Sequence, residues 1–213
     1  MQNEDWREGW RKPDKGAIFV VNSPSGGGKS TLARMLVERV PHLTKSVSTT
    51  TRKPAEGEQD GVDYHFVDSH TFEEMIARGR MLEHVTLYGN HYGTERRGVE
   101  HALMHGNSVV MELNTQGMEY VHNRDPNDVV SVFLLPPSYA VLRKRIVARN
   151  REKTPSAVDE RMEEARREMV YATRYCYVVE NNVLATAYRE LEGIVLAELA
   201  KRHRRAKMLR DIK

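Results

Sequence analysis

Short apolar runs alternate with amphipathic segments of helix length along most of the chain. The runs are rich in β-branched residues, as buried strands are, and occupy residues 17–21, 108–113 and 129–135. Shorter strand candidates lie at 45–49 and 177–179. Because helix-length segments separate these strands, the pattern predicts an α/β fold with a parallel-sheet core and helices on both faces.

The middle of the chain departs from this alternation and predicts a small β-rich insert. Residues 64–67 alternate between apolar and polar side chains, and residues 81–87 lead into a hairpin-like turn at 88–93. Between these strands, Ser69 is expected to cap a short helix.

Capping residues locate several of the other helices. The helix predicted over residues 96–105 is followed directly by a glycine. Ser138 is expected to cap the next helix, and Thr154 and Pro155 suit the N-cap and the first turn of another. A terminal helix is predicted from residue 183 to about residue 205.

A glycine-rich turn with the sequence NSPSGGGKST, at residues 22–31, joins the first strand to the first helix. It matches the phosphate-binding pattern G-x-x-x-x-G-K-S/T, except that Ser23 occupies the first glycine position. Backbone N–H groups of such a loop bind phosphate, Lys29 would reach the β- and γ-phosphates, and Ser30 would place its hydroxyl on Mg²⁺. Ser23 fits a cramped turn if its φ is negative. The alternative is a flexible glycine linker.

The composition argues against several classes of protein and partner but does not identify the function. The net charge of +3 does not indicate a polyanionic partner. No stretch approaches the about 20 apolar residues of a membrane-spanning helix, and the charged N-terminus does not resemble a signal peptide. The single cysteine, Cys176, is expected to pack in an apolar run and suits a reducing cytoplasm, which is the predicted location. The nine histidines lack ligand spacing, so no protein-only metal site is predicted.

A second polar cluster, within the insert, offers ligands for another anion. Its members are Ser48, Arg52, Tyr64, Glu83, Tyr92 and Thr94. A carboxylate only accepts hydrogen bonds, so Glu83 would suit the adjacent N1–H and N2–H₂ donors of guanine, which adenine lacks. A bidentate contact of this kind discriminates by about 1–3 kcal/mol. The alternative for Glu83 is an ordinary exposed carboxylate.

Basic residues are dense between residues 143 and 167, around a predicted helix–loop–helix. Such a run is usually a solvated helix face. In a phosphoryl-transfer enzyme, the same place suits a mobile lid that brings arginines to the transferring group. The C-terminal residues 201–213 are rich in basic side chains. This is typical of a solvated helix end, because the helix dipole favours cations there. No nucleic-acid partner is expected.

Several motifs, taken in order, resemble the guanylate kinase family. They are SVSTTTRKP at 46–54, GEQDGVDY at 57–64, YGNHYGT at 88–94, the Gln116-Gly117 turn and LPPS at 135–138. The resemblance extends from about Gly16 to Ala200, and this combination of motifs is far more specific than the phosphate loop alone.

The resemblance implies a P-loop nucleoside monophosphate kinase that transfers the γ-phosphate of ATP to GMP or dGMP, with Mg²⁺ accompanying ATP. The implied organisation is a flexible arm (1–15), a guanylate kinase-like domain (16–205) and a basic tail (206–213). Within the domain, the resemblance implies a core (16–47, 99–138 and 173–205), a nucleotide-acceptor insert (48–98) and a lid (139–172). No membrane partner is expected, and the sequence is compatible with a homo-oligomer.

The resemblance also implies roles for individual residues. The residues expected to bind ATP are Ser25, Gly26, Gly27, Gly28, Lys29, Ser30, Thr31 and Asn181. Those expected to bind GMP are Ser48, Arg52, Tyr64, Glu83, Tyr92, Thr94 and Asn114. The expected catalytic cations are Lys29, Arg52, Arg145, Arg149 and Arg161.

Several positions depart from the family pattern. Ala55 replaces the usual second arginine for the acceptor phosphate, and Asn114 replaces the usual aspartate near the base. Loss of the arginine would weaken GMP binding by roughly 1.5–3 kcal/mol unless another cation compensates. The candidates for compensation are Lys53, Arg96 and Arg97, and the remaining departures are Ser23, Asn150 and Asn182.

These departures lead to the hypothesis of a working kinase with an altered or weakened acceptor site. One alternative is a kinase for a modified guanine nucleotide or another nucleoside monophosphate. A second is a non-catalytic guanylate kinase-like binding module, which the intact Lys29-Ser30 pair disfavours. A third is a ribose bisphosphate kinase, which the set Ser48, Tyr64, Glu83 and Tyr92 disfavours.

Overall fold

The core of the protein is a parallel β-sheet. The computed structural model describes residues 10–87, 89–148 and 154–211. Within these ranges, a five-stranded parallel sheet has the order β2 (Leu43–Lys45), β7 (Ser108–Met111), β1 (Ile18–Asn22), β8 (Val129–Leu135) and β9 (Tyr177–Glu180). The glycine-rich turn follows the central strand, β1, as the apolar pattern predicts.

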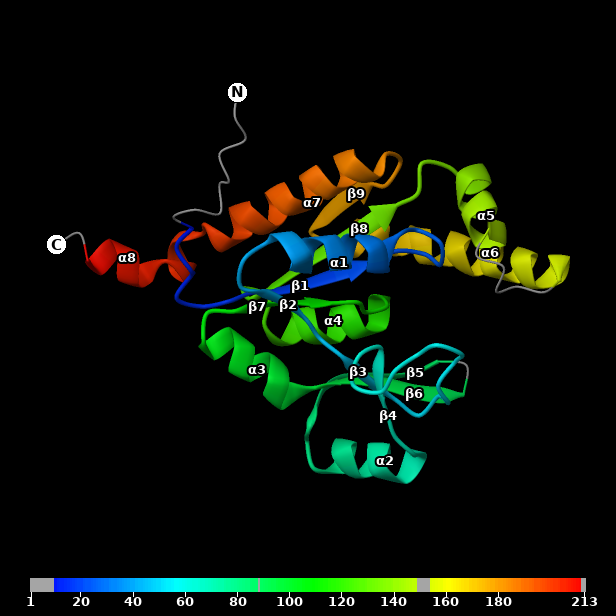
Figure 1. Ribbon diagram of the computed structural model, residues 1–213, viewed down its shortest axis with the longest axis horizontal. Coiled ribbons are helices and arrows are strands. Elements are labelled where there is room, and N and C mark those ends of the chain that lie inside the picture. The colour runs from blue at the N-terminus through cyan, green and yellow to red at the C-terminus, as the bar shows by residue number, and fades with distance from the viewer. Residues whose placement is uncertain (1–9, 88, 149–153, 212–213) are drawn as a thin grey trace.

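Helices cover both faces of this sheet (Figure 1). Phe19 and Val21 point to the face covered by α1 (Lys29–Arg39) and α7 (Leu184–Leu199). Ile18 and Val20 point to the opposite face, which α3 (Arg96–Met104) and α4 (Thr115–Arg124) cover. Alternate side chains of one strand therefore supply two separate hydrophobic cores, and the predicted α/β architecture is confirmed.

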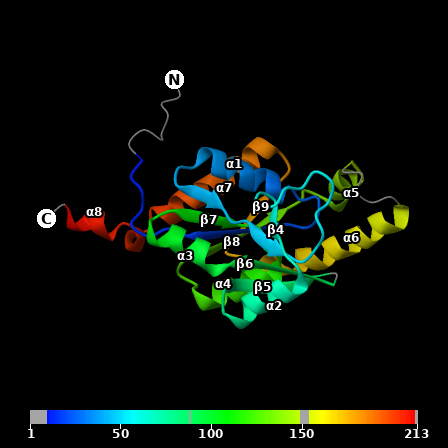
Figure 2. The same ribbon diagram turned by 60° about the horizontal axis from the view of Figure 1, so that its bottom comes forward.

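The insert forms a second sheet (Figure 2), and this sheet has a small hydrophobic core of its own. In the described residues this sheet has four strands, in the order β4 (Tyr64–Phe66), β3 (Ser48–Thr50), β6 (Asn90–Glu95) and β5 (Met81–Leu87). The β3–β4 pair is parallel, and the other two pairs are antiparallel. Helix α2 (Ser69–Ala77) buries Phe72 and Met75 against this sheet.

Two predictions for this region need correction. The single strand expected at 45–49 is two strands in two different sheets, since β2 ends at Lys45 and β3 begins at Ser48. The cap of α2 is Asp68, whose carboxylate accepts from the Thr71 N–H at 2.7 Å, and Ser69 is the first helical residue.

Two helices and a 3₁₀ turn lie beyond the phosphate loop, at one end of the sheet: α5 (Tyr139–Ala148), α6 (Pro155–Val170) and η1 (Tyr171–Arg174). Leu142, Ile146 and Val158 are buried between the two helices. The predicted caps are confirmed: Ser138 accepts from the Val141 N–H, and Thr154 accepts from the Ala157 N–H.

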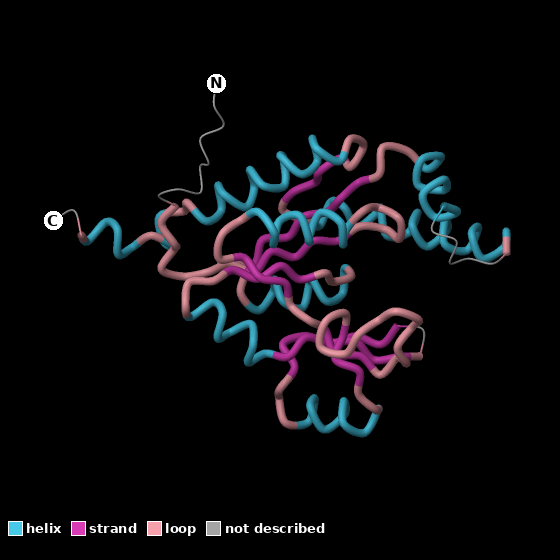
Figure 3. Tube along the Cα trace, viewed as in Figure 1, coloured by secondary structure: helices cyan, strands magenta, loops and turns pink. Residues whose placement is uncertain are grey.

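The C-terminal helix is shorter than predicted (Figure 3). Helix α7 ends at Leu199 and is followed by η2 (Arg202–Arg204) and α8 (Ala206–Arg210). Arg204 is fully buried and donates to the Gly16 carbonyl and the Asp128 carboxylate. A buried guanidinium needs such acceptors, and a continuous helix would carry it away from them.

The segment preceding β1 is packed against this C-terminal turn. The Asp14 N–H donates to the Arg204 carbonyl at 2.8 Å, and the Arg205 guanidinium lies over the Trp10 ring. Residues 10–15 therefore differ from the loose arm expected there. Cys176, expected to pack in an apolar run, is exposed.

Candidate active site

The turn between β1 and α1 is built to expose backbone N–H groups. Gly28 caps α1 with φ at +96°, and no side chain caps the helix. The Asn181 amide donates to the Gly27 carbonyl at 2.7 Å, and a Cβ on Gly28 would lie 2.2 Å from that amide nitrogen. Both the positive φ and the close contact therefore require glycine at position 28. The start of α1 is left free to bind an anion.

Ser23 fits this turn in the manner expected. Its side chain is buried, its N–H donates to Asn22 Oδ1 at 2.8 Å, and its hydroxyl donates to the Pro24 carbonyl. Among the described residues, His42 is the only non-glycine with a positive φ, so Ser23 adopts an ordinary backbone conformation. A turn held by these bonds is not a flexible linker.

One cleft of about 410 Å³ connects the phosphate loop, the insert and the lid. Eleven of the residues that sequence reasoning selected line it: Ser25, Gly26, Gly28, Lys29, Ser30, Ser48, Tyr64, Glu83, Tyr92, Asn114 and Arg161. The remaining described ones lie outside the lining: Gly27, Thr31, Arg52, Thr94, Arg145 and Asn181. Arg149 lies outside the described residues.

Glu112 is a cleft residue that the sequence reasoning missed. It directly follows β7, and its Oε2 accepts from the Ser30 hydroxyl at 2.7 Å. Its Oε1 lies 2.8 Å from the Lys45 ammonium. Ligands of parallel α/β sheets bind at the carboxyl ends of the strands, so its position near the carboxyl end of the predicted core strand 108–113 was the available signal.

The Ser30 hydroxyl and the Glu112 carboxylate fit a hard divalent cation. Mg²⁺ prefers oxygen ligands and is usually held by one or two protein groups together with substrate phosphates and water. Glu112 Oε1 is buried and accepts no well-aligned hydrogen bond, so the carboxylate retains coordination capacity. The described residues contain no cluster of three or more His, Cys, Asp or Glu side chains that could hold a metal ion by themselves.

Glu83 is a buried carboxylate, which contradicts the alternative of an ordinary exposed one. Its side chain accepts from the Thr94 hydroxyl at 2.8 Å, and the residue is 3% exposed. Burial raises its pKa to about 7, although the hydrogen bond from Thr94 opposes this change. A buried carboxylate that lines a cleft is suited to recognise a pair of ligand donors.

Asn114 has a structural role beside this carboxylate. Its Oδ1 accepts from the Gly117 N–H at 2.9 Å and so caps α4. A Cβ on Gly117 would lie 3.0 Å from Glu83 Oε2 and 3.3 Å from Asn114 Oδ1, so the start of α4 passes close to both side chains. Because the helix cap occupies the amide oxygen, the remaining polar group of Asn114 is a donor.

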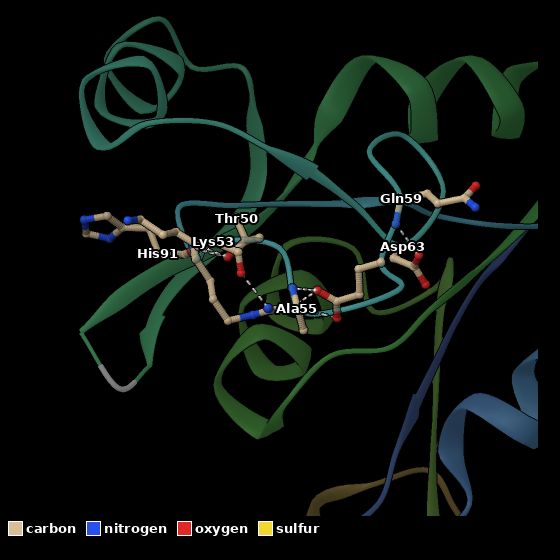
Figure 4. Close-up of polar contacts among 8 residues, drawn as sticks. Thr50, Lys53, Ala55, Gln59, Asp63 and His91 are labelled. Carbon is tan, nitrogen blue, oxygen red and sulfur yellow. Dashed lines mark hydrogen bonds and ion pairs between the residues drawn. The ribbon is translucent and has the colours of Figure 1, made fainter. Parts of the chain in front are cut away.

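Arg52 is held by a carboxylate of its own loop. Its guanidinium donates to both Glu58 oxygens, at 2.9 and 2.8 Å, and lies 5.3 Å from the Tyr64 ring centroid. The Ala55 N–H donates to the same carboxylate at 2.8 Å, as the loop in Figure 4 shows. The two tyrosine rings, Tyr64 and Tyr92, meet edge-on with their centroids 6.1 Å apart. Arg52 thus contacts the Tyr64 ring but is outside the cleft lining.

None of the cations considered as substitutes for the missing arginine lines the cleft. The backbone carbonyl of Lys53 accepts from Arg52. Arg96 donates to the Met81 carbonyl at 2.9 Å and pairs with Glu100, at the other end of the insert. No compensation at Ala55 by Lys53, Arg96 or Arg97 is therefore evident.

The lid contributes Arg161 and Glu168 to the cleft. Arg161 donates to Glu164 at 2.9 Å. Burial raises the pKa of Glu168, and the neighbouring Lys29 opposes that change. Sequence reasoning missed Glu168 because its helix is charged on most sides and nothing in the spacing marks the cleft-facing residue. Arg145 donates to the Asn181 carbonyl at 2.9 Å, which ties α5 to the residue that braces the phosphate loop.

Comparisons with known proteins agree with this geometry. The sequence model of the family described as "Guanylate kinase" matches residues 15–198. The chain belongs to the guanylate kinase family. It is 44% identical over 191 residues to the guanylate kinase of Nitrobacter winogradskyi, covering 90% of this chain and 87% of that protein. It is 40% identical over 201 residues to the guanylate kinase of Alkalilimnicola ehrlichii, covering 92% and 98%.

A solved structure of a guanylate kinase is also similar to this chain. The crystal structure of guanylate kinase from Anaplasma phagocytophilum matches with a TM-score of 0.75 and 31% identity, over 90% of each chain. The predicted family and fold class are therefore confirmed, and the chain is a nucleoside monophosphate kinase by descent. None of the helices in the described ranges is long and apolar enough to span a membrane.

Proposed function

We propose that this guanylate kinase family member transfers the γ-phosphate of ATP to GMP or dGMP, giving ADP and GDP or dGDP. The observation that carries the proposal is a single cleft lined both by Lys29 of the phosphate loop and by the buried Glu83 of the insert. The first suits a nucleotide triphosphate, and the second suits the donor edge of guanine. Near full-length similarity to proteins named guanylate kinase supports the same activity.

The reaction needs no general base. The second pKa of a phosphate monoester is about 6, so the acceptor is mostly dianionic near pH 7. One of its oxygens attacks the γ-phosphorus in line, and the bond from the γ-phosphorus to the bridging oxygen breaks as ADP leaves. The protein's task is to place the two phosphates and to stabilise the charge between them.

The phosphate loop and the lid supply that stabilisation in this proposal. Backbone N–H groups of Gly26, Gly28 and Lys29 and the Lys29 ammonium would hold the β- and γ-phosphates, and Arg161 would approach from the lid. Ser30 and Glu112 would hold Mg²⁺, which when bound neutralises charge on the phosphate oxygens. Arg145 and Arg149 are further lid cations by family resemblance, and lid closure would exclude water from the γ-phosphate.

The insert would hold the acceptor. Glu83 would accept from N1–H and N2–H₂ of guanine, with Ser48 and Thr94 beside it. Tyr64, Tyr92 and Arg52 would contact the acceptor phosphate. Arg52 must then either share its guanidinium between the phosphate and Glu58 or leave that carboxylate.

A second candidate is a kinase for a modified guanine nucleotide. Two observations favour it: Ala55 leaves the acceptor loop without a second arginine, and the capped Asn114 presents a donor in place of a carboxylate oxygen. A non-catalytic binding module is disfavoured, because Lys29 and Ser30 both line the cleft.

The acceptor series decides between these candidates. Steady-state rates with ATP, Mg²⁺ and each of GMP, dGMP, AMP, IMP and XMP are expected to give the highest kcat/KM with GMP and dGMP. Equally poor rates with all five would contradict the guanine assignment, and no rate with any of them would favour the binding module.

Restoration of the missing arginine is expected to tighten acceptor binding. In Ala55→Arg, a second guanidinium would be available to the acceptor phosphate or to Glu58, which would release Arg52. A charge-assisted contact of this kind predicts a KM for GMP lower by roughly tenfold or more, with kcat little changed. The control is Ala55→Gln, which adds length without charge. Equal effects of both variants, or an unchanged KM in Ala55→Arg, would contradict this account of position 55.

A further inference from the structure

The ion pair between Lys45 and Glu112 links the edge of the core sheet to the phosphate loop. Lys45 is the last residue of β2, and after two intervening residues the chain enters the insert as β3. Its ammonium lies 2.8 Å from Glu112 Oε1. The Glu112 side chain is 14% exposed and that of Lys45 is 41% exposed, so the carboxylate is the more deeply placed member of the pair.

The contact is ionic rather than a directed hydrogen bond. Glu112 Oε1 is buried and has no well-aligned donor, so electrostatic attraction is what holds the ammonium beside it. The other oxygen of the carboxylate accepts from the Ser30 hydroxyl at 2.7 Å. The ammonium, the carboxylate and the hydroxyl thus form a continuous series that ends at the first turn of α1.

The cleft carries more carboxylates than cations on its described lining. Glu83, Glu112 and Glu168 line it, against Lys29 and Arg161. Of the three carboxylates, Glu112 contacts the phosphate loop directly through Ser30. An uncompensated negative charge there would repel a triphosphate seated on the loop. Lys45 lies just outside the lining, where it can neutralise Glu112 without occupying the space of a ligand.

We propose that Lys45 is a positioning residue that neutralises Glu112 for a nucleotide arriving without a metal ion. The proposal rests on the nucleotide site proposed above. Glu112 is neutralised by Mg²⁺ as well when the metal accompanies the nucleotide, so Lys45 matters less in that case. Lys45 therefore determines how strongly the affinity for the nucleotide depends on the metal. A residue that contributed to affinity in general would change metal-free and metal-loaded binding equally.

The test compares nucleotide binding with and without the metal. Dissociation constants of a non-hydrolysable ATP analogue are measured by calorimetry in excess EDTA and in excess Mg²⁺. Lys45→Met is expected to weaken metal-free binding about fivefold, the size expected for one partly screened charge pair, and to change metal-loaded binding less than about twofold. Lys45→Arg is expected to restore the wild-type ratio, since it keeps the charge.

A matched control separates this effect from the loss of any lysine–carboxylate pair. Lys15 pairs with the buried Asp128 at the start of the core strands, outside the cleft lining. Lys15→Met is expected to leave both dissociation constants unchanged. In a Glu112→Gln background, Lys45→Met is expected to have no further effect on metal-free binding, because no carboxylate remains to be neutralised.

The outcomes distinguish this inference from the function it rests on. Equal weakening of metal-free and metal-loaded binding in Lys45→Met, or no weakening in either, would overturn the role of Lys45 and leave the kinase assignment intact. Persistence of the Lys45→Met effect in the Glu112→Gln background would also overturn it. Failure of the wild-type protein to bind the analogue in either condition would contradict the proposed nucleotide site, and this inference with it.

Discussion

Lys29→Ala is expected to reduce kcat at least about a hundredfold while the fold is retained. Lys29 is the first residue of α1 and lines the cleft beside the open N-terminus of that helix. Its ammonium would stabilise charge on the β- and γ-phosphates during transfer, and removal of one such preorganised group typically costs a factor of 10²–10³ or more. Alanine is a good helix former, so α1 is expected to persist.

The measurement is kcat with saturating ATP and GMP, together with the melting temperature of each variant. Arg34→Ala is the matched control, because Arg34 is another cation of α1 and its side chain is 72% exposed. The control is expected to keep wild-type turnover. Near-normal turnover in Lys29→Ala would refute the role assigned to the phosphate loop.

Glu83→Gln is expected to have two opposite effects. The KM for GMP should rise about 10- to 100-fold, because glutamine replaces one acceptor of the guanine edge with a donor. The unliganded protein should become more stable at pH values above about 7, where the wild-type carboxylate is ionised in a buried site. A residue that lowers stability and raises affinity is typical of a binding site.

The pH dependence of this stabilisation follows from the pKa of Glu83, which burial raises from 4.5 to about 7. Between these values the folded state binds more protons than the unfolded state, so the contribution of Glu83 to stability falls as pH rises through this range. The advantage of Glu83→Gln in the free energy of unfolding is thus expected to be small near pH 5. It should approach about 2–3 kcal/mol near pH 8.

Denaturant unfolding of both proteins at pH 5 and pH 8 measures this difference. Glu73→Gln, in the exposed part of α2, is the control and is expected to show no such pH dependence. A constant difference between Glu83→Gln and wild type across the range would indicate that Glu83 is not buried as an ionised group. An unchanged KM for GMP would remove Glu83 from guanine recognition.

The core of the fold could be predicted because its signals are local. The run 129–135 is apolar and β-branched and is strand β8, and Thr154 and Pro155 begin α6 as their capping chemistry requires. The junction at 45–49 was wrong because strand propensity alone does not reveal a change of sheet. The end of α7 was wrong because it depends on acceptors for Arg204 that lie far away in the sequence.

In the candidate site, too, the residues with local signals were predicted, and those that depend on distant contacts were missed. Lys29, Ser30 and Glu83 were predicted from a local motif, from donor and acceptor chemistry, and from family resemblance. Glu112 and Glu168 were missed, because each becomes a cleft residue only when distant segments meet. The contacts of Arg52 with Glu58 and Tyr64 likewise depend on how one loop folds back on itself.

A crystal structure with GMP and a non-hydrolysable ATP analogue bound together tests the central claim most directly. The account predicts guanine with its N1–H and N2–H₂ on the Glu83 carboxylate, and the triphosphate on the turn at residues 23–30. The acceptor phosphate should face the γ-phosphate in line between them. A purine bound away from Glu83, or a triphosphate bound away from Lys29, would contradict it.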